Sequence, residues 1–428
     1  MRPGHPSEVN SGGCQDSESP FEVHPAKREF GFLLACIRSF FRRETELPPT
    51  IGLDWLKLLQ LAQRHSVLAL FCQAVGGCQD IPVEVVSYVR KRAMEAARFD
   101  LTLNAELARL LELFVAHKIQ VVPLKGPVLG QTLYVDTALR SSSDLDLLVQ
   151  PKDVTRARQL LEGKGYRLES VLHWPVESAY LRCRDSQLSF VPATSEPADA
   201  VCIDLHWRLL PGYFPPAFDD RQVWASLRKV AVAGTFASTL SLEHLVLFLC
   251  AHGTKHLWER LGWICDIARL VQLETAIDWA QVFNQARETD TSRMVVLGLL
   301  LASELLGVDP PPEAVEYAGE DPTACVLARI VVRRMQDEIG TPPSAVESAL
   351  FSCRAFERTR HRVRLLIGIF VEPTEAEYQA LKLPPSLHWL YYLFRPLRLM
   401  AKYAREPRKR KPGAVTRATS AVLPLKSD

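Results

Sequence analysis

The spacing of hydrophobic residues changes twice along the chain and divides it into three parts. From residue 29 to about residue 117, apolar side chains recur every three or four positions, as in FGFLLACIRSFF and LNAELARLLELFVAH, which predicts three or four helices. The spacing then shortens to short apolar runs typical of strands. The predicted strands cover residues 119–124, 145–149, 166–172, 187–192 and 201–207.

Helical spacing appears once inside this central part and returns after it. Residues 151–166 open with a proline, repeat apolar residues at helical spacing and close at Gly163 or Gly165, which predicts a crossover helix. After about residue 240 the helical spacing continues almost to the end, interrupted by proline-rich loops. The pattern predicts an α+β protein with a small mixed β-sheet. We place an N-terminal helical segment at 29–117, the sheet domain at 118–235 and a larger C-terminal helical domain at 236–405.

The two ends of the chain are polar. Residues 1–28 lack the basic-then-apolar order of a secretory signal and residues 406–428 are basic, and we predict both to be disordered. The ten cysteines show no CxxC spacing and no uninterrupted apolar run reaches about 18 residues, which favours a cytoplasmic protein with reduced thiols. Because the formal net charge is only +2, we expect no stable nucleic-acid partner.

The sharpest chemical signal lies where a predicted strand begins with Asp144-Leu145-Asp146. Side chains two apart on a strand share a face, so the two aspartates present paired carboxylates while the leucine faces the core. Asp204 and His206 share a face of the last predicted strand, and Asp204 supplies a third carboxylate. Carboxylate oxygens suit Mg²⁺ or Mn²⁺. The alternative is an exposed strand edge with solvated aspartates.

A second signal lies upstream of these aspartates. Lys125 and Gly126 end an apolar strand and open a predicted helix. The free amides at a helix start can hold a phosphate, with the lysine as a point charge nearby. Pro127 follows and removes one amide donor from that turn.

Together these motifs resemble the DNA polymerase β-like nucleotidyltransferase superfamily. More closely, the chain resembles the bacterial family of uncharacterised nucleotidyltransferases over about residues 30–403. The matching motifs are the LKG turn, the 134–136 stretch, RSSSDLDLLV at 140–149, GKGY at 163–166, DLHWRL at 204–209 and HLWERLGWICDIARL at 256–270. The resemblance implies a sheet of nucleotidyltransferase type, metal binding by Asp144 and Asp146, a metal or catalytic role for Asp204, and nucleotide contacts around Lys125, Gly126 and Arg140.

The activity implied by the resemblance is metal-dependent nucleotidyl transfer. A nucleoside monophosphate would move from an NTP to an unidentified small-molecule or protein acceptor, with release of pyrophosphate and with Mg²⁺ or Mn²⁺ as cofactor. Further candidates for nucleotide contact are Ser143, His206 and Lys255. Either Asp204 or His206 can serve as general base. The alternatives are a non-catalytic nucleotide-binding or scaffold protein and an enzyme that modifies proteins, as a toxin or a regulator.

Two features of the C-terminal part have both a structural and a functional interpretation. His252 and His256 lie one helical turn apart, as in zinc sites, but no third ligand is evident and we favour no zinc. His252 is instead a candidate for phosphate contact beside Lys255. Asp266 interrupts an apolar helix face, and we expect a structural ion pair with Lys255 or Arg269.

Residues 383–411 combine aromatic side chains with a basic end. This composition suits a membrane interface or an acidic partner. Because both halves of the segment carry apolar residues that a helical body would bury, we favour a last core helix kinked at Pro396 over peripheral membrane contact.

Overall fold

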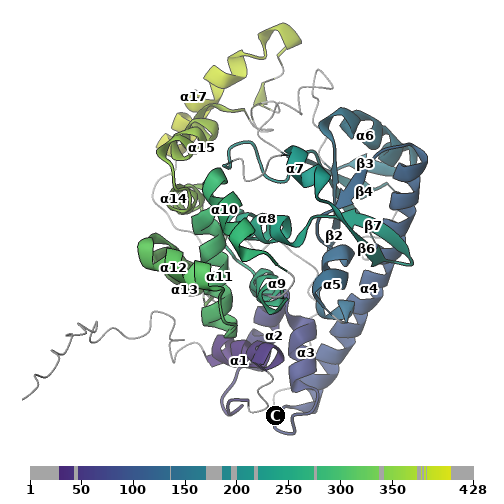
Figure 1. The fold of residues 1–428 in the computed structure, drawn as a ribbon, viewed down its shortest axis with the longest axis vertical. Helices are drawn as coiled ribbons and strands as arrows, with labels where there is room; N and C mark the ends of the chain where they lie inside the picture. The colour runs from purple at the N-terminus through teal and green to yellow at the C-terminus, as the bar shows by residue number, and fades with distance from the viewer. Residues whose placement is uncertain are drawn as a thin grey trace, which may run out of the picture.

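A small β-sheet lies between a long helix on one side and a body of helices on the other in the computed structural model (Figure 1). The structure describes residues 28–42, 47–134, 136–169, 186–193, 200–215, 220–273, 277–336, 342–373, 377, 380–381 and 383–405. The two predicted disordered tails lie outside these residues, except that Arg28 already begins the first helix.

The helices agree with the predicted order of the three parts. The N-terminal part holds α1 (Arg28–Arg42), α2 (Trp55–Arg64), α3 (Leu68–Val75) and α4 (Val83–Ala116). The sheet region holds α5 (Pro127–Leu133), α6 (Val154–Gly163), α7 (Asp220–Ala225) and the short helices η2 (Thr137–Leu139) and η3 (Pro151–Asp153). The C-terminal part holds α8 (Leu242–Lys255), α9 (Leu261–Gln272), α10 (Trp279–Thr289), α11 (Ser292–Leu306), α12 (Pro312–Glu320), α13 (Thr323–Met335), α14 (Ala345–Ala355), α15 (Thr359–Val371), η6 (Pro385–Leu387) and α17 (Leu390–Arg405).

All five predicted strands are present in one sheet. They are β1 (Val121–Pro123), β2 (Asp144–Val149), β3 (Tyr166–Leu168), β4 (Gln187–Pro192) and β5 (Cys202–His206). The spatial order is β1-β2-β5-β4-β3, in which β2 and β5 are parallel and every other pair is antiparallel. The predicted crossover helix is α6, which follows β2. The α+β fold with a small mixed sheet is therefore confirmed.

Helix α4 connects the two hydrophobic cores of the protein. Its 34 residues give it a length of about 50 Å, and it runs along one side of the molecule from α3 to the sheet (Figure 1). Near its start, Val85 and Val89 pack with the helical body, whereas Leu107 and Phe114 pack under the sheet. The helix thus links the core under the sheet to the core of the helical body.

The helical body is built around α11, most of whose residues are buried, with α8 and α9 beside it. Trp258, between α8 and α9, is completely buried there. Gly253 makes room for its indole, since a Cβ atom at that position would lie 2.6 Å from the ring. None of the described helices has the length and apolar composition that spanning a membrane needs.

A two-stranded hairpin, β6 (Arg228–Val232) and β7 (Thr235–Thr239), was not predicted. Its turn places Ala233 and Gly234 at positive φ, the conformation of a tight hairpin turn. Because alanine rarely adopts positive φ, the sequence does not predict this turn. The hairpin is joined to the sheet edge by a hydrogen bond from Thr239 Oγ1 to the carbonyl of Pro123 at 2.9 Å. β7 crosses the predicted domain boundary at residue 235.

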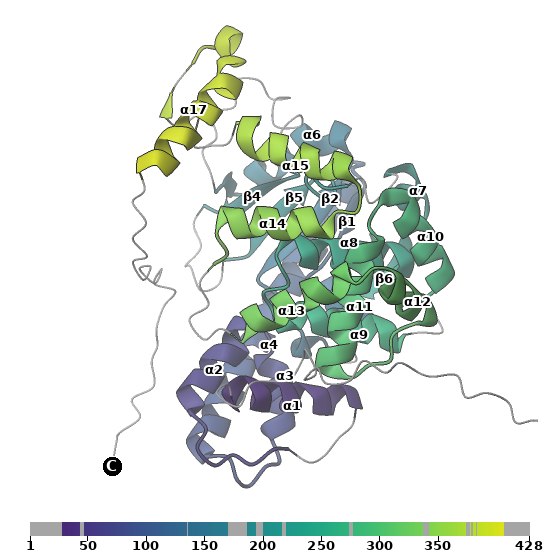
Figure 2. The same ribbon diagram turned by 90° about the vertical axis from the view of Figure 1, so that its left-hand side faces the viewer.

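α17 lies uppermost in Figures 1 and 2, with α15 below it and α14 below α15. α17 continues through Pro396, with Tyr391 and Arg395 buried on its inner side. The prediction that its apolar residues lie in the core is wrong for Tyr392, Leu393, Leu397 and Met400, which are exposed.

Candidate active site

The strand pair β2 and β5 brings two predicted site residues face to face. Asp146 and Asp204 are direct partners in the parallel register, although 58 positions separate them in the chain. On the opposite face Leu145, Leu147 and Ile203 fill the core under the sheet. The alternation of polar and apolar residues along β2 and β5 therefore puts the carboxylates of both strands on the face of the sheet opposite the core.

Asp146 is almost fully buried and has two partners. Lys125 Nζ lies 3.1 Å from its Oδ1, and His206 Nε2 lies at the same distance from that oxygen. Burial alone would raise the pKa of Asp146, but the Lys125 ammonium and the hydrogen bond to His206 outweigh it and hold the pKa below its ordinary value. The carboxylate is therefore ionised at neutral pH.

Asp144 has a different environment two residues earlier. Burial, followed by the negative charge of Asp146, raises the pKa of Asp144. The repulsion between the two carboxylates is only partly offset by Lys125. This end of β2 thus holds more negative charge than its neighbours balance.

Asp204 is held by two donors from β4 that sequence reasoning missed. Gln187 Nε2 donates to Oδ2 and Ser189 Oγ donates to Oδ1, each at 2.6 Å. The alternation of polar and apolar residues in QLSFVP already predicts that Gln187 and Ser189 share a strand face. The sequence does not show that β4 pairs with β5, which is what brings these two side chains to Asp204. The carboxylate of Asp204 therefore has a set orientation.

The Lys125-Gly126 turn is shaped by a glycine that no other residue could replace without strain. Gly126 has a φ of 64°, and a Cβ atom there would lie 3.3 Å from the carbonyl oxygen of Asp144. Its own carbonyl accepts a hydrogen bond from Arg140 Nη1 at 3.3 Å. This turn positions the Lys125 ammonium beside the carboxylate of Asp146.

Arg140, predicted to contact the nucleotide, is engaged behind the turn. Its Nε donates to Asp266 at 3.1 Å, its Nη1 donates to Ser142 Oγ at 2.8 Å, and Tyr134 donates to the same aspartate at 3.1 Å. Asp266 thus forms the expected ion pair, but with Arg140 instead of Lys255 or Arg269. Arg140 and Asp266 balance each other and fix the turn relative to α9.

The wall opposite the sheet comes from the end of α8 and the start of α9. It presents Lys255 and Arg260 together with His252, His256 and Trp263. The connection between the helices places Leu257 and Trp258 at positive φ, a strained conformation held by the buried indole. This turn aims the basic side chains into the cleft.

The two histidines of this wall are uncharged at neutral pH. Their ring centroids lie 4.7 Å apart, and both rings contact Trp263. Burial, and after it the charge of Lys125, lowers the pKa of His252. Burial, and after it the charge of Lys255, lowers the pKa of His256 to about 3. Lysine and arginine therefore carry the positive charge of this wall.

A cleft of about 310 Å³ lies between the two walls. All nine predicted site residues line it: Lys125, Gly126, Arg140, Ser143, Asp144, Asp146, Asp204, His206 and Lys255. Aspartates line the sheet wall, whereas the helical wall and the turn carry Lys125, Lys255 and Arg260 together with one acidic residue, Glu259. Such a cleft can bind a metal ion on one wall and phosphates on the other.

The donor set on the sheet fits a divalent cation. One ligand atom each from Asp146, Asp204 and His206 lie within 4.8 Å of one another. His206 Nδ1 is buried and has no hydrogen-bond partner among the described residues. The predicted metal set was Asp144, Asp146 and Asp204. The group in the structure contains Asp146 and Asp204 but not Asp144, and His206 is its third member. The position of His206 two residues after Asp204 on one strand face was the available signal.

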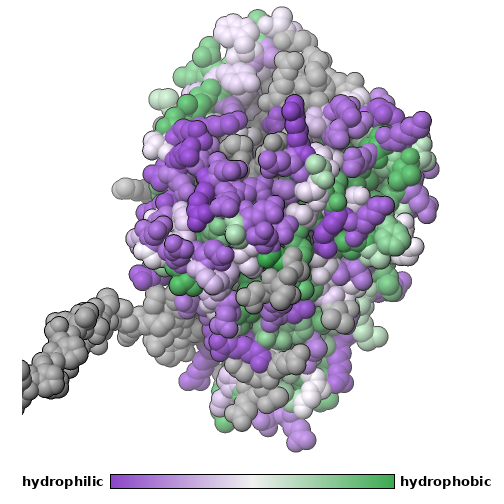
Figure 3. Space-filling model, viewed as in Figure 1, coloured by the Kyte–Doolittle hydropathy of each residue, from purple (hydrophilic) through white to green (hydrophobic). Residues whose placement is uncertain are grey.

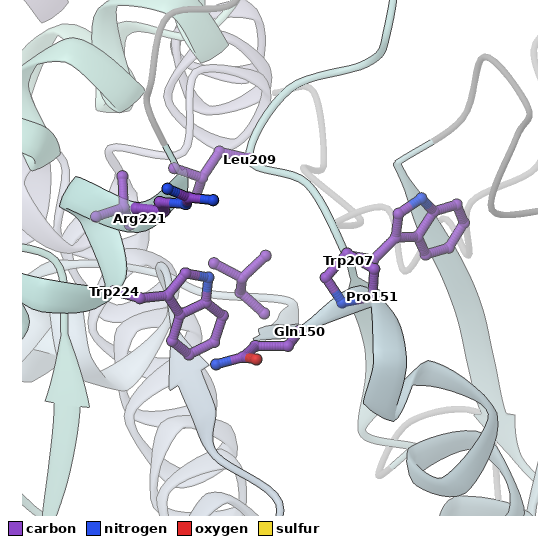
Figure 4. A pocket seen from close by; sticks show the side chains of 8 residues that line it. Gln150, Pro151, Trp207, Leu209, Arg221 and Trp224 are labelled. Atoms are coloured by element: carbon purple, nitrogen blue, oxygen red, sulfur yellow. The ribbon is translucent and has the colours of Figure 1, made fainter.

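A second hollow of about 270 Å³ adjoins the cleft and shares Leu209 with it. Trp224 and Arg221 extend from α7 on one side, towards Gln150 and Pro151 at the end of β2 on the other (Figure 4). Leu148, which follows Asp146 on the same strand face, forms part of its floor. The hollow combines an aromatic surface with polar groups that can orient a ligand.

Comparison with known proteins identifies the family to which the chain belongs. Residues 52–307, more than half of the chain, match the model of the family described as uncharacterised nucleotidyltransferase. The matched segment contains the whole sheet and every cleft residue named above. The searches of curated proteins and of solved structures gave no match.

Proposed function

Because the chain belongs to the uncharacterised nucleotidyltransferase family and is therefore a nucleotidyltransferase, we propose that it transfers a nucleoside monophosphate from an NTP to an acceptor, with release of pyrophosphate. The observation that carries this proposal is the register of β2 and β5, which sets Asp146 opposite Asp204 at the floor of a cleft with a basic far wall. Paired carboxylates facing cations are what a metal-bound triphosphate requires.

In this proposal the sheet wall holds the cofactor. Asp144, Asp146 and Asp204, together with His206, would hold Mg²⁺ or Mn²⁺. The metal, when bound, neutralises phosphate charge and stabilises the departing pyrophosphate. Lys125, at the rim beside Asp146, and Lys255, on the opposite wall, bind the phosphate oxygens as point charges.

Two residues of β5, Asp204 and His206, are the candidates for proton transfer. Asp204 accepts the proton of the attacking acceptor group, while Gln187 and Ser189 keep its carboxylate oriented. His206 is the second candidate, since its Nδ1 has no partner among the described residues. The hollow of Figure 4 is the place we propose for the acceptor, because Leu209 and Leu148 join it directly to the metal-binding face.

Two measurements on the purified protein test the proposal. The first is pyrophosphate release, with each NTP in turn, Mg²⁺ or Mn²⁺, and a panel of small hydroxyl and amino compounds and proteins as acceptors. The second is calorimetric NTP binding with and without metal, which needs no acceptor. Metal should strengthen NTP binding to the wild type, and Asp146→Asn should abolish this effect while the protein stays folded.

A surface change serves as the matched control. Asp80→Asn removes an exposed carboxylate that does not line the cleft, and the variant should bind metal and NTP like the wild type. Equal metal-dependent NTP affinity in Asp146→Asn and the wild type, with native melting of both, would contradict the metal assignment.

A further inference from the structure

Helix α17 presents its apolar side to solvent. The exposed side chains are Trp389, just before the helix, and Tyr392, Leu393, Leu397 and Met400, which are 49% to 70% exposed. Their spacing of three, four and seven or eight residues places them on one helical face. Single exposed apolar residues are ordinary on protein surfaces, but a continuous stripe marks an interaction surface.

The opposite face of α17, which carries Arg395, Arg398 and the buried Tyr391, is turned towards the protein. Arg395 Nη1 lies 2.9 Å from Oε2 of the fully buried Glu377, and Arg398 Nε donates to Oε1 at 2.6 Å. Arg395 Nε also donates to the carbonyl of Ile369 at 2.9 Å. These contacts fix the rotation of the helix. An isolated globular protein would gain by turning the apolar face inward instead.

Helix α15, which packs against α17, exposes a second apolar stripe. Val363, Leu366, Ile367 and Phe370 follow the spacing i, i+3, i+4 and i+7 and are 40% to 54% exposed. Only Leu365 of this helix's large apolar residues is buried. Figure 3 shows hydrophobic side chains gathered over α15 and α17 at the upper left edge, beside a predominantly hydrophilic face.

Positive charge is concentrated in the same part of the chain. Residues 384–428 contain ten lysines and arginines and only two acidic residues, a net charge of +8, although the whole chain carries +2. Four of these charges are consecutive, at 408–411, directly after α17. An apolar helix face next to a basic segment has the composition that binds an anionic lipid surface.

We propose that the exposed faces of α15 and α17 dock the protein on an anionic lipid bilayer. The apolar stripes enter the boundary between headgroups and acyl chains, and the positive charge of the sequence that follows α17 favours an anionic surface. None of the cleft residues takes part, so the proposal is independent of nucleotidyl transfer.

Charge and composition favour lipid over two other occupants of these faces. A second copy of the chain would bring two segments of net charge +8 together, which opposes association. The N-terminal residues 1–27 contain few large apolar side chains, among them Val9, Phe21 and Val23, and cannot cover two helical stripes. An anionic bilayer satisfies both the apolar area and the charge.

Vesicle co-sedimentation of the full chain tests the proposal. One set of vesicles contains phosphatidylcholine alone and the other contains phosphatidylcholine with phosphatidylglycerol. The wild type should sediment with the anionic vesicles only, and less at high salt. Leu393→Ser with Leu397→Ser should weaken this binding by about tenfold or more. Replacing residues 408–411 with glutamine should weaken it by about fivefold for each charge removed.

The control variant is Val115→Ser with Phe236→Ser, which removes two equally exposed apolar side chains, 73% and 72%, from other surfaces. It should bind vesicles like the wild type. The two serine variants change exposed residues, and no variant changes a cleft residue, so each should keep the wild-type melting temperature and metal-dependent NTP binding.

Three outcomes would overturn the lipid assignment. The wild type could ignore anionic vesicles, or the control variant could lose as much binding as the α17 variant. In the third, sedimentation velocity without lipid would show a wild-type dimer that the α17 variant abolishes, and the occupant of the stripes would then be a second copy of this chain.

Discussion

The cleft and the C-terminal end both bury charged side chains, but they do so in opposite ways. At the C-terminal end, Glu377 is enclosed by Arg395 and Arg398, and every acceptor oxygen has a cationic partner. In the cleft, Asp144 and Asp146 lie side by side, and although Lys125 and His206 contact Asp146, the negative charge of Asp146 still raises the pKa of Asp144. One group of buried charges is balanced by the protein itself and the other is not.

The difference indicates which buried charges serve structure and which serve a ligand. A balanced cluster satisfies its desolvation cost internally and needs nothing from solution. An excess of buried carboxylates raises the pKa of one member and is relieved by a cation. Arg140 and Asp266 belong to the first kind although they adjoin the cleft, because each has the other as partner.

The largest expected effect is on turnover, when the proposed proton acceptor of the cleft is removed. Asp204→Asn should lower turnover by about 10²–10⁴, the usual contribution of a positioned base, and leave NTP affinity within a few fold of the wild type. Steady-state kinetics with an accepted acceptor and calorimetry with NTP measure the two quantities. His206→Ala should cost less. Full turnover in Asp204→Asn would move the base to His206.

A smaller effect, on stability, is expected from breaking the balanced cluster. Glu377→Gln leaves two arginines without a counter-charge and should lower the free energy of unfolding of the C-terminal end by about 3 kcal/mol. Limited proteolysis and thermal unfolding detect the loss. Glu288→Gln, an exposed change on α10, is the matched control and should be neutral.

A triple variant separates balance from mere packing. Replacing Glu377, Arg395 and Arg398 together with methionine removes all three charges and should restore much of the stability that Glu377→Gln loses. If the triple variant is as unstable as Glu377→Gln, the charges are not acting as a balanced set.

The smallest effect should have the opposite sign. Asp144→Asn removes one of two repelling carboxylates and should raise the stability of the metal-free protein at pH 7, by less than Glu377→Gln lowers it. The folded-state pKa of Asp144 lies above its unfolded value, so the wild type gains stability as the pH falls through that pKa. The advantage of Asp144→Asn should therefore shrink on acidification.

Thermal unfolding across pH, without and with Mg²⁺, measures this effect. Added Mg²⁺ should stabilise the wild type and have little effect on Asp144→Asn. A variant that is less stable than the wild type at every pH, without metal, would show that the carboxylates of the cleft are balanced after all.

What the sequence by itself determined is local. Alternation of apolar and polar residues placed β2 and β5 and put Asp144, Asp146 and Asp204 on the polar faces of their strands, because strand geometry depends only on neighbouring residues. The Lys125-Gly126 turn could also be predicted, because a glycine at the end of an apolar run is a local signal. Amphipathic spacing likewise predicted the helices that precede and follow the sheet.

What only the tertiary structure decided is which segments meet. The register of Asp146 with Asp204, the support of Asp204 by Gln187 and Ser189, and the pairing of Arg140 with Asp266 join segments far apart in the chain. The outward apolar face of α17 was equally hidden from sequence. A helical period shows that a helix has two faces, whereas the position of a buried partner such as Glu377 decides which of them turns inward.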